Sequence, residues 1–436
     1  MATSTLGIRR EDKSRWERRA PITPDIAREL VRQGFEVVVQ PSAIRAYTDA
    51  EWVAAGARIA EDLSGCGVVL GVKEMPPAVF RPAGAYVFFA HVAKGQKYNM
   101  PMLKELLARR ATLVEYEKIV DDKGRRLVFF GRHAGLAGTI DSLWVLGRRL
   151  LHEGLDTPFA AIEPAHRYKD LADAKRALGD VGRRIRESGL PASLVPFVAG
   201  VTGYGHVGGG ANEVLEALGA QEVSPAELAA LFRPGGADAK AVYRVTFKEE
   251  HTVEPTAPGA KFDLQEFFQR PERYRGVFER WVPMLTVLVN CVYWDVRYPR
   301  LVTKDSCRKL WAQPGLPRLR VIGDVTSDIL GSVECNVQAT GSEDPVYVWD
   351  PVTDKAVPGW TGRGPIVLAV DNLPCELPIE STSSFGAALL PFLATLLRAD
   401  WTRPFDELDL PRELKDAVIA HRGELTPKYA YIAGLW

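Results

Sequence analysis

The stretch LVPFVAGVTGYGHVG, residues 194–208, decides the fold class of this 436-residue chain. It opens with a short apolar run, which is typical of a buried strand, and continues into Gly203, Gly205 and Gly208, spaced as G-x-G-x-x-G. A helical pattern follows over residues 211–218. This order of strand, turn and helix is the context in which the motif binds a dinucleotide.

Each glycine of the motif has a physical role. The first permits a tight turn, the second lets backbone amides approach a pyrophosphate, and the third allows helix and strand to pack closely. The N-terminus of the helix then faces the anionic pyrophosphate. Because the chain has 38 glycines, the spacing alone is a weak signal and a plain connecting loop is the alternative. The surrounding pattern favours dinucleotide binding.

The end of the following strand bears on the choice of cofactor. We expect that strand at residues 221–224, where a terminal acid would hold the ribose hydroxyls of NAD. Ser224 occupies the place, and Glu227 falls just beyond it. Since no acid stands there to exclude a 2′-phosphate, the sequence favours NADP(H) over NAD(H). Glu222 argues the other way, and the nearest arginine is Arg233.

Apolar, strand-like runs alternate with helical stretches on both sides of this loop. The strands expected before it are at residues 35–39, 68–72 and 86–90, and those expected from the loop onward are at 195–199, 284–290, 319–323 and 366–370. Residues 131–151 read as one long helix that links the two halves, and residues 391–436 as a mostly helical segment that folds back on the first half. This alternation predicts parallel sheets flanked by helices.

We therefore predict an α/β chain with two Rossmann-like domains and an interdomain cleft. A substrate-binding and catalytic domain comprises residues 1–133 and 376–436, and a dinucleotide-binding domain comprises residues 134–375.

Composition limits the classes of partner. The 55 basic and 55 acidic residues give a net charge of zero, which argues against nucleic acid or an anionic membrane as the main partner. No apolar run approaches the roughly 18 residues of a membrane span, and the N-terminal residues resemble neither a signal nor a transit peptide. The five cysteines are scattered without a CxxC pair. We expect reduced thiols, no structural metal and a cytoplasmic location.

Two titratable residues follow neighbouring strands of the first half. Lys73 ends the run at 68–72 and His91 ends the run at 86–90. Ligands of open α/β sheets bind beyond the carboxyl ends of the strands, so these two residues form a candidate acid–base pair. The alternatives are a solvated lysine and a histidine satisfied within the core.

Other charged residues of the first half are weaker candidates. Arg19 precedes a helix that opens after Thr23, and Arg126 follows a turn at residues 122–124. Arginine forks suit carboxylates, although doublets of this kind are usually surface charges. Glu115 and Glu117 lie two residues apart in one run, which is either a strand or an irregular segment.

Several motifs resemble one enzyme family. Those shared with the N-terminal domain of the alanine dehydrogenase/saccharopine dehydrogenase superfamily are Arg19 with Thr23-Pro24, Lys73-Glu74-Met75-Pro76, and Phe89-Ala90-His91 with Lys94. Those similar to the lysine–2-oxoglutarate reductase half of the bifunctional aminoadipic semialdehyde synthase are residues 7–12, 16–21, 130–135, 157–159, 289–294, 371–374 and 423–429. The resemblance spans nearly the whole chain.

The resemblance implies an NADPH-dependent oxidoreductase of lysine degradation, which condenses L-lysine with 2-oxoglutarate and reduces the product to saccharopine. It implies Lys73 and His91 as catalytic residues, and the following residues around the substrates: Arg19, Lys94, Glu117, Arg126 and Asp371. It places Asn290, Asp324 and Asp328 beside the cofactor, together with the three loop glycines and Ser224. A homo-oligomer is compatible with it.

Two other functions stay open at this stage. One is an amino-acid dehydrogenase of the alanine type, against which residues 371–374 and the surroundings of Glu117 argue. The other is a non-catalytic nucleotide-sensing protein on the same fold, against which the presence of both Lys73 and His91 argues.

Overall fold

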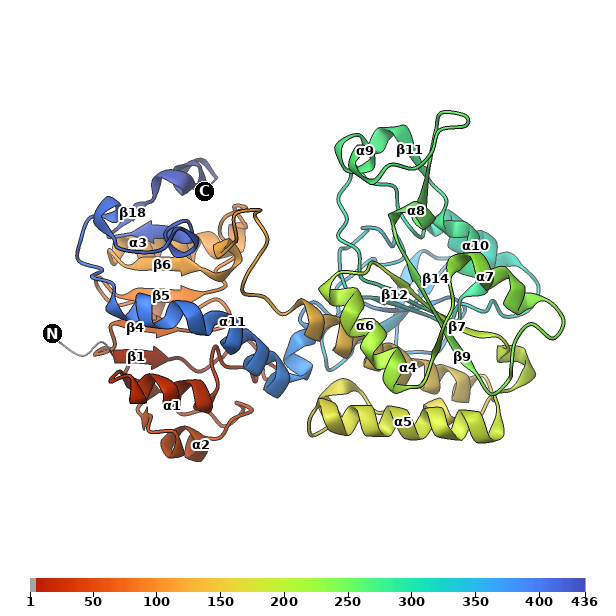
Figure 1. The fold of residues 1–436 in the computed structure, drawn as a ribbon, viewed down its shortest axis with the longest axis horizontal. Coiled ribbons are helices and arrows are strands. Elements are labelled where there is room, and N and C mark those ends of the chain that lie inside the picture. Colours follow the sequence, from red (N-terminus) through yellow and green to blue (C-terminus); the bar gives the residue numbers. More distant parts are fainter. Residues whose placement is uncertain (1–4, 436) are drawn as a thin grey trace. The chain divides into compact units, whose positions relative to one another are not determined.

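The computed structural model describes residues 5–435, and the chain divides into two compact units. The first unit contains the described residues up to Phe130 and those from Pro378 onward, and the second is Gly131–Leu377. Among the described residues, each unit contains an eight-stranded sheet with helices packed on it (Figure 1). No described helix is both long and apolar enough to cross a membrane.

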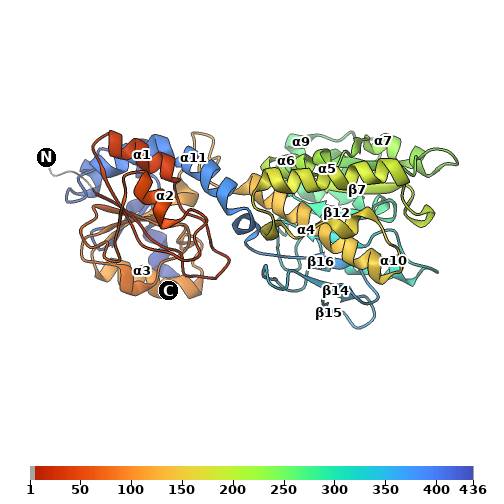
Figure 2. The same ribbon diagram turned by 90° about the horizontal axis from the view of Figure 1, so that it is seen from below.

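The sheet of the first unit is mostly parallel. In spatial order its strands are β18 (Glu424–Leu425), β17 (Val418–His421), β6 (Thr112–Glu115), β5 (Ala85–Phe88), β4 (Val68–Leu70), β1 (Thr5–Ile8), β2 (Glu36–Val39) and β3 (Arg58–Ile59). Only β17 and β18 run antiparallel to their neighbours. Helices α1 (Pro24–Arg32) and α11 (Pro378–Arg398) lie on one side of this sheet and α3 (Met100–Ala108) on the other (Figure 2).

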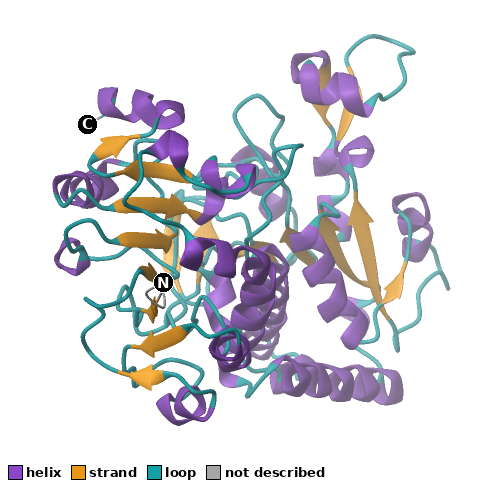
Figure 3. Ribbon diagram, turned by 60° about the vertical axis from the view of Figure 1, so that its left-hand side comes forward, coloured by secondary structure: helices purple, strands orange, loops and turns teal. Residues whose placement is uncertain are grey.

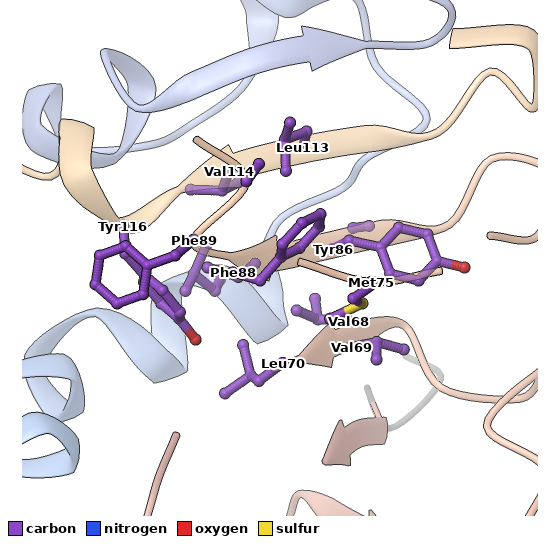
Figure 4. Close-up of a cluster of buried hydrophobic side chains, with 14 of the residues drawn as sticks. Val68, Val69, Leu70, Met75, Tyr86, Phe88, Phe89, Leu113, Val114 and Tyr116 are labelled. Atoms are coloured by element: carbon purple, nitrogen blue, oxygen red, sulfur yellow. The ribbon is translucent and has the colours of Figure 1, made fainter. Parts of the chain in front are cut away.

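The core of the first unit is formed where β4, β5 and β6 meet these helices. Leu70, Phe88 and Val114 are completely buried (Figure 4). Phe89, the residue that follows β5, packs edge-on against Tyr116. The strands β4, β5 and β6 are buried on both faces, as expected for a parallel sheet covered by helices.

The prediction of a mostly helical segment over residues 391–436 is wrong in two respects. The helix α11 begins at Pro378 and continues through Pro391, because buried leucines on either side of the proline keep it packed. Residues 418–421 then pair with β6 as β17. This short run is wholly buried, which favours a strand over an exposed helix. The expectation that the segment folds back on the first half is confirmed by this pairing.

The sheet of the second unit has a parallel centre. In spatial order its strands are β15 (Lys355–Pro358), β14 (Val346–Asp350), β16 (Ile366–Leu368), β13 (Val321–Asp324), β12 (Val287–Asn290), β7 (Phe197–Thr202), β9 (Val242–Phe247) and β8 (Gln221–Glu222). Among the described strands of this sheet, only β14 runs opposite to the others, and it pairs antiparallel with both β16 and β15. Strands and helices alternate along much of this unit, and Figure 3 shows helices beside the strands in both units.

Both faces of this sheet are buried. Phe197, Ala199 and Val201 of β7 belong to the core under helices α4 (Gly131–His152), α5 (Leu171–Ser188) and α6 (His206–Ala217). Val198, between them in sequence, belongs to the opposite core, which includes residues of α10 (Lys304–Ala312). This alternation is the period of two that a strand imposes, and it holds β7 at the centre of the unit.

The strand expected at residues 221–224 is present as the shorter β8. The strand beside β7 is β9, however, and β8 lies beyond β9 at the edge of the sheet. Both residues of β8 are exposed, whereas β9 has six residues that pair with β7 along its full length. The longer and more apolar run therefore takes the buried position.

Candidate active site

The glycine-rich loop forms a close backbone cradle at the start of α6. Gly203 has a φ of +88°, in the left-handed region that favours glycine. A Cβ on Gly208 would lie 2.2 Å from the carbonyl oxygen of Gly203, so no side chain fits there. Gly205 caps the helix, and a Cβ on it would meet nothing within 4 Å. The cradle thus leaves open space at the N-terminus of a 12-residue helix, which suits an anionic phosphate.

A cavity of about 490 Å³ adjoins this loop. Its lining includes the loop residues, the aromatic side chains of Phe267, Trp294 and Tyr298, and the polar residues Glu249 and Thr252. This volume lies within the usual range for small-molecule pockets, which combine apolar walls with a few polar groups. The cavity is therefore suited to the adenosine half of a dinucleotide.

The end of β9 brings charged residues to this cavity. Lys248 follows the strand directly, and its ammonium lies 5.8 Å from the ring centre of Tyr204 in the glycine-rich loop. Glu249 lines the cavity and hydrogen-bonds to Tyr204. Burial, together with the charge and hydrogen bond of Glu249, raises the pKa of Tyr204. The sequence prediction included neither Lys248 nor Glu249, because it considered only the end of the strand expected at residues 221–224.

Ser224 lies elsewhere. It caps the short helix α7 (Pro225–Leu228), and Glu227 accepts hydrogen bonds from its backbone and hydroxyl at 2.8 and 2.7 Å. Glu222 pairs with Arg244 at 2.7 Å. β9 separates this edge from β7, and a role for Ser224 toward the cofactor stays a prediction.

Asn290 and Asp324 belong to a buried network at the ends of three parallel strands. Asn290 donates to Asp324 and accepts from the Thr202 hydroxyl, both at 2.8 Å. Asp324 also accepts from Asn336 at 2.8 Å and from Thr326 at 2.7 Å. Burial raises the pKa of Asp324 against these hydrogen bonds. The network joins β7, β12 and β13, and a role toward the cofactor stays a prediction.

Asp328 and Asp371 are exposed and belong to loops of the second unit. Asp328 comes four residues after β13, and Asp371 comes three residues after β16. Both loops lie beyond carboxyl ends of strands, as a ligand site in such a sheet requires.

In the first unit, Lys73 and His91 lie beyond the carboxyl ends of the neighbouring parallel strands β4 and β5. The pairing continues past both strands, since Phe89 donates its backbone N–H to Val72 at 3.1 Å. Burial, followed by the positive charge of Arg19, lowers the pKa of Lys73, and Glu17 opposes the shift. A lysine whose pKa is lowered in this way is better suited to proton transfer.

His91 is held by the residue next to Lys73. Its Nδ1 lies 2.9 Å from Oε1 of Glu74, and Glu74 also accepts from Lys13 at 2.8 Å. Burial opposes ionisation of Glu74, but the hydrogen bonds from His91 and Lys13 outweigh it and hold its pKa below the usual range. An ionised Glu74 fixes the proton of His91 on Nδ1 and leaves Nε2 as the basic nitrogen.

The residues expected around the substrates differ in their exposure and in the ion pairs that they form. The Arg19 guanidinium is almost fully buried, binds Glu17 through two hydrogen bonds of 2.6 and 2.5 Å, and lies over the ring of Phe130. Arg126 pairs with Glu117 at 2.9 Å and is about half exposed. Lys94 is exposed.

Two buried glutamates hold the strand ends themselves. Glu11 accepts from the backbone of Val72 and Lys73, and Glu115 accepts from that of Ala90 and His91. Burial raises the pKa of both carboxyls to about 7. Glu115 and Glu117 do not share a strand, because β6 ends at Glu115 and a 3-10 helix begins at the next residue. A polar residue in an otherwise apolar strand was the available signal for Glu115.

Comparisons with known proteins agree with this architecture. Residues 7–137 match the family "Alanine dehydrogenase/PNT, N-terminal domain". The structure is similar to that of an L-alanine dehydrogenase, with a TM-score of 0.63 and 18% identity, covering 99% of this chain and all of that one. At this identity the likeness shows the fold alone.

Sequence relatives extend over almost the whole chain. It is 38% identical to the alpha-aminoadipic semialdehyde synthase of Arabidopsis thaliana and 36% identical to the mitochondrial one of Bos taurus, in each case over 99% of its own length. It spans only 41% and 48% of those two proteins. It is also 27% identical to a saccharopine dehydrogenase [NAD(+), L-lysine-forming] of Yarrowia lipolytica, over 91% of this chain and 95% of the relative. Residues 7–137 thus match an N-terminal domain of the alanine dehydrogenase family, and the chain as a whole is similar in sequence to alpha-aminoadipic semialdehyde synthases and saccharopine dehydrogenases.

Proposed function

We propose that this chain is a lysine–2-oxoglutarate reductase, which condenses L-lysine with 2-oxoglutarate and reduces the product to saccharopine in lysine degradation. The observation that carries the proposal is the Lys73, Glu74 and His91 arrangement at the ends of adjacent strands. The names of the relatives supply the substrate class, and the glycine cradle of the second unit supports a dinucleotide.

The reaction requires proton transfers that these side chains can perform. The substrate amine must lose a proton before it attacks the oxo carbon, and the hydroxyl of the resulting carbinolamine must gain one to leave as water. His91 can accept a proton at Nε2 while Glu74 stabilises the charged ring. Lys73 is the second group, because its lowered pKa lets it exchange a proton at a pH where free lysine would not.

The substrates carry carboxylates that need cationic partners. Arg126 is the more accessible of the two predicted arginines, and its present partner is Glu117. A bound carboxylate would compete for Arg126, and Glu117 would then be available to an amino group of lysine. Arg19 is committed to Glu17, so we assign it chiefly the task of keeping positive charge near Lys73. Roles for Lys94 and Asp371 remain part of the proposal.

We propose that NADP(H) is bound by the second unit, with Gly203, Gly205 and Gly208 at the pyrophosphate. The nicotinamide supplies the hydride when bound. Lys248 is the residue we assign to the 2′-phosphate, because it extends from the end of the strand beside β7 and lies next to the glycine-rich loop. Glu249 is the competing feature, since a carboxylate here suits the ribose of NAD. Hydride transfer also requires the predicted cleft, which stays part of this proposal.

Lys248→Met tests the cofactor assignment. The kcat/KM for NADPH should fall about tenfold, equal to ~1.4 kcal/mol, while the value for NADH changes little. Lys240→Met, at an exposed lysine of the same unit, is the matched control. A Ser224→Ala variant with the larger loss would return the assignment to the edge strand, and an unmodified protein that prefers NADH would assign the ribose to Glu249.

The proposed activity is tested by following NADPH oxidation with lysine and 2-oxoglutarate, omitting each in turn. Oxidation that needs both substrates supports the proposal. Turnover with ammonia and pyruvate in place of the pair would indicate the alanine type instead. Dinucleotide binding without turnover on either pair would indicate a sensing protein. We keep a cytoplasmic location within the proposal, although the mammalian relative is named as mitochondrial.

A further inference from the structure

Two buried carboxylates make the same kind of contact at the two strand ends that carry Lys73 and His91. Glu11 accepts from the N–H of Val72 at 2.7 Å through Oε1 and from the N–H of Lys73 at 2.9 Å through Oε2. Glu115 accepts from the N–H of Ala90 and of His91, both at 2.9 Å, through Oε2. Each carboxylate therefore accepts hydrogen bonds from two consecutive backbone N–H groups. One belongs to Lys73 or His91, and the other belongs to the residue before it.

The sheet order explains why there are two such contacts. Along the sheet, β6, β5, β4 and β1 are consecutive. Glu115 is the last residue of β6 and binds the end of β5, while Glu11 follows β1 and binds the end of β4. The end of β5 is therefore held by a residue of β6, and the end of β4 is held by a residue that follows β1. The two strands whose ends are held, β4 and β5, lie side by side between them.

These backbone positions would otherwise lack partners. The strands end before Lys73 and His91, so no ladder hydrogen bond serves their N–H groups, and buried N–H groups without partners are costly. His91 also has a φ of +51°, an uncommon conformation for a residue with a side chain. A conformation of this kind persists only where surrounding contacts impose it. The Glu115 carboxylate is placed to impose it.

We propose that Glu11 and Glu115 are positioning residues, each of which fixes the backbone at one catalytic strand end and so sets where the Lys73 and His91 side chains meet the substrate. This inference rests on the proposed function. Neither glutamate needs to touch substrate: each is almost completely buried, with Glu11 6% exposed and Glu115 0% exposed. A displacement of about 1 Å at a reacting group can cost roughly a hundredfold in rate.

The two carboxylates differ in a way that allows a sharp test. Glu11 uses both oxygens for the strand end, so a glutamine must turn its amide donor toward one of the two N–H groups. Glu115 uses one oxygen for both bonds and offers the other only to the Glu117 N–H at 3.2 Å. A glutamine at position 115 can therefore keep both bonds to Ala90 and His91.

The experiment compares Glu11→Met, Glu11→Gln, Glu115→Met and Glu115→Gln in the full chain. Both methionine variants should lower kcat about 10- to 100-fold with little change in the KM for NADPH. Glutamine should restore most of the lost kcat at position 115 and little of it at position 11. Glu153→Gln is the control, because Glu153 is a buried carboxylate of the second unit that pairs with Arg149 and Arg320. Glu153→Gln should lower the melting temperature but should not reduce kcat as the methionine variants at positions 11 and 115 do.

Hydrogen–deuterium exchange gives a readout that does not depend on turnover. Glu11→Gln should speed exchange at residues 71–75 and leave residues 88–94 unchanged, and Glu115→Met should do the reverse. If the unmodified protein is inactive on lysine and 2-oxoglutarate but shows this exchange pattern, the proposed function fails and the backbone role stands. Equal rescue by glutamine at both positions, or losses in kcat that only follow the melting temperature, would overturn the inference.

Discussion

At the scale of single residues, the site is built from groups whose charge is set by burial. Burial and the charge of Arg19 lower the pKa of Lys73, and hydrogen bonds from His91 and Lys13 hold the pKa of Glu74 below its usual range. Perturbed pKa values that cluster in one place are typical of acid–base sites. Residue-scale predictions therefore concern proton transfer.

Lys73→Met and His91→Gln should each lower kcat by about 10²- to 10⁴-fold, the usual range for loss of general acid–base catalysis. The affinity for NADPH should stay near normal, because the glycine cradle belongs to the other unit. The double variant should lose much less than the product of the two single losses, since groups that act together are not additive. Near-normal turnover with an unchanged pH profile in the single variants would show that the pair is only structural.

Arg19→Met should move the pH dependence of kcat. The positive charge of Arg19 lowers the pKa of Lys73, and its loss also removes the cation that offsets the charge of Glu17, which raises that pKa. Both effects have the same sign, so the limb of the profile that reports Lys73 should move to higher pH. Methionine keeps apolar contact with Phe130. Arg28→Met, at an exposed arginine of α1 that pairs with Asp25, should leave the limb in place; an equal movement there would point to a general charge effect.

At the scale of elements, the decisive contact is between α6 and the loop that precedes it. The third glycine of the motif lies so close to the first that their backbones touch, and this fixes the helix N-terminus against β7. Any added atom must push the helix away from the strand.

Gly208→Ala should weaken NADPH binding by about tenfold or more, ~1.4 kcal/mol, because its Cβ would lie 2.2 Å from a backbone oxygen. Gly209→Ala is a matched control on the same turn, since a Cβ there meets nothing within 4 Å. Both affinities can be measured by fluorescence titration with NADPH. If the two variants bind alike, close helix–strand packing does not form the cradle.

The local sequence pattern predicted the helices and strands whose own residues indicate both their conformation and their burial. The helix expected at residues 131–151 is α4, and the strands expected at 68–72 and 86–90 are β4 and β5, each shorter by a residue or two. Sheet order could not be predicted in the same way, because the choice between β8 and β9 as neighbour of β7 depends on pairing across distant residues. The exposure of β8 is a property of the folded sheet, not of its two residues.

The candidate site shows the same division. The placement of Lys73 and His91 on adjacent strand ends followed from strand alternation alone. Sequence spacing does not specify how these strands pack against each other. That packing produces the hydrogen bond between His91 and Glu74, and the hydrogen bond that Glu11 accepts from the backbone of Val72, 61 residues away. Lys248 was missed for a related reason, since its importance derives from the sheet order.

At the scale of the whole molecule, the first unit is discontinuous and the second is not. The core of the first unit contains Phe385, Leu389 and Val418 together with residues of the N-terminal strands. The second unit has its own cores within residues 131–377.

Residues 131–377 expressed alone should therefore unfold cooperatively on heating and bind NADPH, whereas residues 1–130 alone should not fold. The shorter piece lacks α11 and β17, which leaves β6 as an unpaired edge and exposes apolar side chains that the full chain buries. Calorimetry and size-exclusion chromatography would distinguish these outcomes. A folded, monomeric 1–130 piece would show that the C-terminal segment is dispensable for this unit.

The pairing of β17 with β6 also sets an order of events during synthesis. A ribosome releases β6 early and the residues of β17 only after the entire second unit has emerged. Domains generally fold as units while the chain is still being made, so the later-made unit reaches its native form first and the earlier one waits. During that interval the strand ends bearing Lys73 and His91 belong to an incomplete sheet. The nascent chain thus completes the unit with the glycine-rich loop before the unit with these two residues, and the edge of β6 stays uncovered until β17 arrives.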